Sequence, residues 1–200
     1  NKATTAENTY HSDKIPFAFN YIDSMYDYVT HDRDSATDHG SHVAGIAAAN
    51  RYIEKDGQMV DALETVKVAG NAPDAQIIVL KVFGLMGGAY TSDYMAAIED
   101  AIILGCDSVN LSLGTTTAGF SDAGDYEQVM KSLEKSDTVV VMAAGNEGHG
   151  AENGTQKHFL DNGYLYADDV LGSTIGSPGS YTNSMAVASA DNAKVTMNGF

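Results

Sequence analysis

Two short segments of the sequence carry side chains that suit acid–base chemistry. Residues 38–45 contain His39 and His42, and residues 143–148 contain Asn146 in a glycine-rich setting. An imidazole titrates near neutral pH, so a histidine can take a proton from a hydroxyl and later return it to a leaving amine. An asparagine amide can donate a hydrogen bond to an oxygen that becomes negative in a transition state. His39 and Asn146 are therefore candidates for a general base and an oxyanion donor.

The residue types alone leave other interpretations open. His39 and His42 are three residues apart, so they can share a metal ion or form a structural pair, although the glutamate and wider spacing of a zinc-protease helix are missing. Asn146 follows an apolar run, where an asparagine is also common simply as a turn residue. Gly40 permits close approach of the backbone beside His39 and favours its catalytic interpretation. For Asn146, His39 upstream and the segment Ser112-Leu113-Gly114 between the two favour the oxyanion donor.

Apolar runs rich in β-branched residues alternate with helix-like stretches, which predicts an α/β fold: a doubly wound, mostly parallel sheet with helices on both faces. Residues 43–49 are expected to form a helix with His39 at its mouth, and residues 145–184 long surface loops. Further strands are expected at 76–83, 107–112, 138–143 and 185–189, and further helices at 91–104, ending at Gly105, and 122–135. This order places residues 112–114 and 145–146 at the carboxyl edge of the sheet, where an extended peptide can lie.

The composition limits the classes of function. The 200 residues suit one sizeable domain, and the formal net charge of −16 argues against nucleic acid as a partner. The charge fits either simple solubility or attraction of a cationic substrate. No apolar run approaches the roughly 18 residues that would span a membrane. Cys106 is the single cysteine, and its apolar setting predicts a buried thiol with a structural role.

Four motifs in order resemble those of the subtilisin-like serine proteases. They are residues 39–45, which resemble the histidine segment; 72–77 with Lys81-Val82, the strand-entry motif; 110–114, the substrate-binding strand; and 143–146, the oxyanion segment. The resemblance covers roughly residues 14–192, as part of one incomplete catalytic domain across residues 1–200. Residues 15–21 and 187–192 are similar to the cell-envelope proteinases of Gram-positive bacteria, of the lactocepin and complement-cleaving peptidase type.

This resemblance implies an acyl-transfer mechanism with His39 as general base and Asn146 as oxyanion donor. Ser112, Leu113 and Gly114 would form the wall that pairs with a peptide substrate, and His42 would be a structural neighbour. The resemblance also implies a secreted or envelope-attached protein with no evident cofactor. It allows calcium in the complete enzyme, but the scattered Asp32, Asp34 and Asp38 do not define a calcium site, and the cluster of residues 32–34 is interpreted as a solvated loop.

The family's orienting aspartate and nucleophilic serine have no clear match. Asp23 lacks the glycine of the aspartate motif, and Ser184 lies in a Ser-Met-Ala run that continues as a strand. We therefore expect a central fragment that is inactive alone and needs the rest of the catalytic domain. One alternative is a non-catalytic module that binds an extended peptide along residues 112–114. A more distant one is a metal-dependent hydrolase built on His39, His42 and Asp38.

Overall fold

The computed structural model divides the chain into two compact units, Asn1–Cys106 and Asp107–Phe200, which are described separately. It describes residues 10–22, 38–66, 69–84, 88–114, 124–145, 178–181 and 183–189, and only the backbone of residues 124–127 and 130. The expectation of one partial catalytic domain across residues 1–200 stays a prediction.

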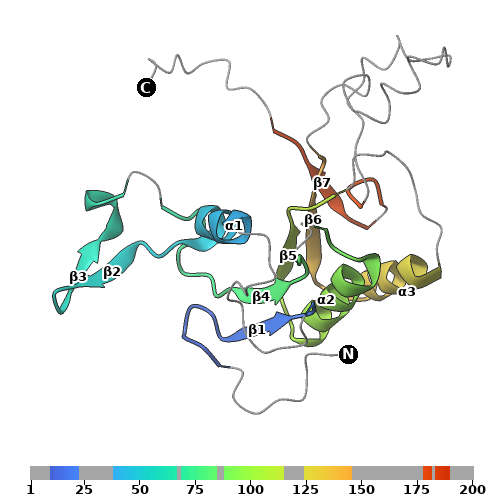
Figure 1. Cartoon of the computed structure of the whole chain (residues 1–200), viewed down its shortest axis with the longest axis horizontal. Helices are drawn as coiled ribbons and strands as arrows, with labels where there is room; N and C mark the ends of the chain where they lie inside the picture. Colours follow the sequence, from blue (N-terminus) through green and yellow to red (C-terminus); the bar gives the residue numbers. More distant parts are fainter. Residues whose placement is uncertain are drawn as a thin grey trace, which may run out of the picture. The chain divides into compact units, whose positions relative to one another are not determined.

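The first unit is built on a pair of parallel strands. Strand β1 (Phe17–Asn20) pairs with β4 (Ile78–Lys81), and all four residues of β1 are buried (Figure 1). A strand covered on both faces has no hydrophobic alternation to reveal it, and β1 was not predicted from the sequence. Strand β4 confirms the strand expected at 76–83, with shorter ends.

The segments that lead into these two strands are tied together. The backbone N–H of Ile77 donates to the carbonyl of Lys14 at 2.8 Å. The Lys14 ammonium in turn donates to the carbonyl oxygens of Pro73 and Ala75, at 2.6 and 2.7 Å. Lys14 therefore holds the strand-entry motif through the motif's backbone carbonyls. These hydrogen bonds align β4 with β1.

Helix α2 (Thr91–Ile103) confirms the predicted helix and its end at Gly105. Gly105 has a φ of 74°, a left-handed conformation that glycine adopts at little cost. The N–H of Gly105 donates to the Ile102 carbonyl and that of Cys106 to the Ala101 carbonyl, at 3.1 and 3.0 Å. This pair of hydrogen bonds is a Schellman motif, which satisfies carbonyl groups at the end of the helix.

The expectation of a buried Cys106 thiol was wrong, because the residue is half-buried. It stands just after the Schellman turn, where the chain leaves α2 toward the next strand. Apolar neighbours in the sequence did not translate into full burial, and Ile103, three residues earlier, is itself 58% exposed.

A β-hairpin that was not predicted lies between α1 (His39–Ala48) and β4. Its strands are β2 (Tyr52–Lys55) and β3 (Gln58–Asp61), paired antiparallel and standing apart from the β1–β4 pair in Figure 1. The turn residues Asp56 and Gly57 have φ values of 52° and 76°, as a type I′ turn requires. The Asp-Gly pair was therefore the available signal. A short 3-10 helix, η1 (Ala62–Glu64), follows β3.

The second unit contains a parallel sheet with the strand order β5-β6-β7. Its strands are β5 (Ser108–Leu111), β6 (Val139–Ala143) and β7 (Met185–Val187), and α3 (Gly124–Leu133) connects the first two (Figure 1). Val140 and Met142 of β6 are buried, as are Val129 and Leu133 of α3. These elements confirm the predicted strands and helix to within a few residues. Residues 122–123 and most of the predicted 145–184 loop lie outside the described residues.

Candidate active site

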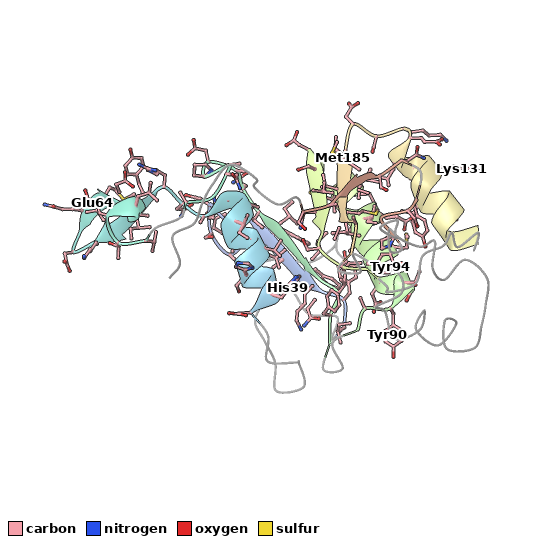
Figure 2. All side chains as sticks on the ribbon, turned by 90° about the horizontal axis from the view of Figure 1, so that it is seen from above. His39, Glu64, Tyr90, Tyr94, Lys131 and Met185 are labelled. Atoms are coloured by element: carbon pink, nitrogen blue, oxygen red, sulfur yellow. The ribbon has the colours of Figure 1, made fainter. Side chains whose placement is uncertain are left out.

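His39 is the first residue of α1, which confirms the predicted position at the mouth of a helix. Asp38 occupies the N-cap, and its carbonyl accepts a 2.9 Å hydrogen bond from the N–H of His42. Residues 39–42 are exposed in the first unit, and Figure 2 shows His39 at the N-terminal end of the helix. The imidazole is thus carried on regular backbone while remaining accessible.

The other end of α1 is fixed by the segment that leads toward β4. The N–H groups of Asn71 and Ala72 donate to the carbonyls of Ile46 and Ala47, at 3.0 and 2.8 Å. The Asn71 side-chain amide adds a 2.9 Å bond to Ile46. These donors satisfy carbonyls that the helix end leaves without partners, so they also set where His39 stands.

This contact depends on Gly70. A Cβ atom at that position would lie 2.2 Å from the backbone N of Ala49 and 2.6 Å from the backbone C of Ala48. Both are backbone atoms that a rotamer change cannot move. A glycine is therefore required for the close approach of this segment to α1.

The shared-metal interpretation of His39 and His42 gains no support. Within the part of the chain that the structure describes, no three histidine, cysteine or acidic side chains gather as metal ligands. Asp38, the third group of that hypothesis, belongs to this described part and joins no such cluster.

The predicted substrate-binding residues directly follow β5 in the second unit. The parallel pairing of β5 with β6 ends at Leu111 and Met142, and Ser112, Leu113 and Gly114 continue beyond it. Ser112 and Leu113 are half-buried and Gly114 is exposed. The backbone of this extension therefore lies outside the β5–β6 ladder, as a segment that pairs with a peptide must.

Asn110 is a neighbour of this segment that sequence reasoning did not single out. Its side-chain amide Nδ2 donates a 2.9 Å hydrogen bond to Ser112 Oγ. Residues two apart on an extended chain share a face, so the spacing places the amide and the hydroxyl on one side without showing that they meet.

Asn146 lies outside the described residues, so its role as oxyanion donor stays a prediction. The chain is described up to Gly145, whose φ of 114° is a conformation that favours glycine. Just before it, the N–H of Ala144 donates to the Val187 carbonyl of β7 at 2.9 Å. The segment that leads to Asn146 is thus anchored on the sheet.

The two weak triad candidates fare differently. Asp23 lies outside the described residues. Ser184 is described, and its hydroxyl donates a 2.8 Å hydrogen bond to the Tyr181 carbonyl directly before β7. The strand expected after Ser184 is confirmed, in contrast to the helix opening that carries the serine in the resembled family.

The chain belongs to the subtilase family. The profile of that family matches residues 5–198, nearly the whole sequence. The expected subtilisin-like α/β fold is confirmed by this match and by the solved structure of the S41 psychrophilic protease. That structure aligns with a TM-score of 0.59 and 23% identity, covering 96% of this chain and 52% of that one.

Curated relatives include bacterial proteinases. The chain is 32% identical over 197 residues to the PI-type proteinase of Lactococcus lactis subsp. cremoris, which covers 96% of this chain and 10% of that protein. It is 35% identical over 115 residues to the major intracellular serine protease of Bacillus subtilis (strain 168), covering 57% of this chain and 31% of that protein. The chain thus spans about a tenth of the length of the lactococcal relative.

Proposed function

We propose that this chain is the central part of a serine endopeptidase that hydrolyses peptide bonds through an acyl-enzyme. The observation that carries the proposal is the subtilase match across residues 5–198, with the four motifs in the family's order. Relatives named as proteinases favour this function over a peptide-binding module without catalysis.

His39 is the proposed general base. A serine hydroxyl attacks the scissile carbonyl while His39 Nε2 takes its proton, and the histidine then returns that proton to the leaving amine. Water repeats the sequence on the acyl-enzyme and releases the second product. The exposed position of His39 at the first turn of α1 supports this role, because a base must reach the reacting hydroxyl.

Asn146 is the proposed oxyanion donor, and residues 112–114 the proposed peptide-binding wall. Loss of one such donor slows catalysis by about 100- to 1000-fold in enzymes of this kind. The free extension of β5 beyond the β5–β6 ladder supports the second assignment. The substrate is therefore an extended polypeptide. Acyl transfer by these groups needs no cofactor, and calcium in the complete enzyme would serve structure.

The orienting aspartate and the nucleophilic serine are proposed to belong to other parts of the catalytic domain. The hydrogen bond of Ser184 to a carbonyl, directly before a strand, supports the exclusion of that serine. We further propose a secreted or envelope-attached location, supported by the similarity of residues 15–21 and 187–192 to cell-envelope proteinases. Among the residues that the structure describes, no helix is long and apolar enough to cross a membrane.

The test is the His39→Ala variant of the complete proteinase. Turnover of a tetrapeptide p-nitroanilide is expected to fall by about 10⁴-fold or more, because the residual rate comes only from binding and the oxyanion hole. Ser41→Ala, two residues further along the same exposed turn, is the matched control and keeps the activity. Peptidase activity that survives in His39→Ala would reject His39 as the base.

A further inference from the structure

We infer that Asn110 is a positioning residue for the peptide-binding segment Ser112–Gly114, and that it acts through the hydroxyl of Ser112. This inference rests on the proposed function, because it assigns a role within the proposed peptide-binding wall. It is carried by the 2.9 Å hydrogen bond from Asn110 Nδ2 to Ser112 Oγ.

The segment needs such support because the sheet does not provide it. Up to Leu111, the backbone of β5 is held by the parallel ladder with Met142 and its neighbours. Ser112 is the first residue beyond that ladder. A peptide that pairs with this extension requires its N–H and C=O groups in fixed directions before binding, since ordering them during binding lowers affinity.

Asn110 is suited to provide this order. It lies within β5, where its own backbone is fixed opposite Val141, so its side chain starts from a rigid position. Residues 110 and 112 share a face of the extended chain, and the amide therefore reaches Ser112 without leaving the strand direction. Because the amide nitrogen is the donor, the bond orients the Ser112 hydroxyl and leaves its proton for another acceptor.

If Asn110 served only the stability of the fold, its removal would lower the melting temperature rather than weaken peptide binding. The side chain is exposed, so its removal opens no gap in the core and leaves Val140 and Met142 covered. Asn110→Ala is expected to shift the melting temperature no more than an ordinary surface substitution. Its effect should appear instead in the binding of the peptide.

The experiment measures steady-state kinetics of the complete proteinase on a tetrapeptide p-nitroanilide. Asn110→Ala is expected to raise KM about three- to tenfold with kcat unchanged, the sign of lost uniform binding. Ser112→Ala should raise KM similarly, and the double variant no further, because the two residues act through one bond. Asn110→Asp, which can accept a hydrogen bond from the serine hydroxyl, should restore KM toward the starting value. Ser132→Ala, which removes a half-buried hydroxyl from α3, is the control.

A second measurement separates this inference from the proposed catalysis. Binding of the corresponding tetrapeptide amide is followed by calorimetry in the His39→Ala background, where turnover plays no part. Asn110→Ala should weaken binding by the same three- to tenfold factor. Unchanged KM and binding in Asn110→Ala, or independent additive effects of Asn110→Ala and Ser112→Ala, would overturn the positioning role. An enzyme that binds the peptide with this dependence yet never cleaves it would overturn only the proposed function.

Discussion

The phenol of Tyr21 donates a 2.7 Å hydrogen bond to Oδ2 of Asp100 inside the first unit. It joins the residue after β1 to the buried face of α2, where Asp100 is fully inaccessible to solvent. The other carboxyl oxygen, Oδ1, has no hydrogen-bond partner among the residues that the structure describes. The buried carboxyl therefore depends heavily on one tyrosine, which ties the residue after β1 to α2.

Tyr21→Phe is expected to destabilise the chain by about 1–3 kcal/mol, because it leaves Oδ2 of Asp100 buried without this donor. The free energy of unfolding in urea measures the effect. Tyr90→Phe is the matched control, since Tyr90 is 75% exposed and the loss of its hydroxyl should change stability by less than about 0.5 kcal/mol. Equal effects of the two substitutions would contradict the importance of the Tyr21–Asp100 bond.

The same tyrosine predicts a loss of stability at alkaline pH. Burial, and then the hydrogen bond to Asp100, raise the pKa of Tyr21 above its usual value of 10.0. The folded state therefore keeps the neutral phenol, and its contribution is fully present below pH 10. Above that pH the unfolded state ionises first, and Tyr21 should lower stability by about 1.4 kcal/mol per pH unit. Urea unfolding between pH 8 and 11 should show this slope, and Tyr21→Phe should lack it.

Gly70→Ala is expected to destabilise the chain by about 1–3 kcal/mol or more, because the added Cβ meets the backbone of Ala48 and Ala49. Gly45→Ala provides the comparison. Gly45 lies within α1, a Cβ there meets nothing within 4 Å in this chain, and alanine should stabilise the helix by about 0.5–1 kcal/mol. Thermal melting of both variants checks the prediction; a harmless Gly70→Ala would mean that the segment is not held against α1.

The 200-residue chain by itself should not react with a fluorophosphonate probe, because the nucleophilic serine is proposed to lie outside it. Gel fluorescence after labelling measures this, with the complete proteinase as the positive sample. Labelling of the isolated chain that disappears in Ser184→Ala would show that Ser184 is the nucleophile, and the proposal for an outside serine would fail.

The sequence predicted the elements whose signals are local. Helix α2 has periodic apolar residues and ends at Gly105, so its bounds followed closely, and the valine-rich run of β6 was equally plain. Strand β1 was missed because its four residues are uniformly buried and short. The hairpin was missed although Asp56-Gly57 marks its turn, because the flanking strands expose polar and apolar residues alike.

Sequence patterns predicted the positions of single residues of the site but not the contacts between them. The position of His39 at the start of α1 followed from the helical pattern of residues 43–49. The hydrogen bond between Asn110 and Ser112 did not follow, because strand spacing places side chains on one face without showing which of them meet. Cys106 shows the same limit, since apolar neighbours in the sequence indicate hydrophobicity and not depth.

The close approach of Gly70 to Ala49 has a consequence for how such a chain can change. The backbone leaves α1 at Ala49 and contacts the same point again at Gly70, so the β2–β3 hairpin and η1 lie in a loop whose two ends are held together. The entropic cost of closing a loop rises only slowly with its length, and a loop of this kind tolerates replacement. The hairpin can therefore be lengthened, shortened or exchanged for another module while the helix that carries His39 keeps its anchor to the segment before β4.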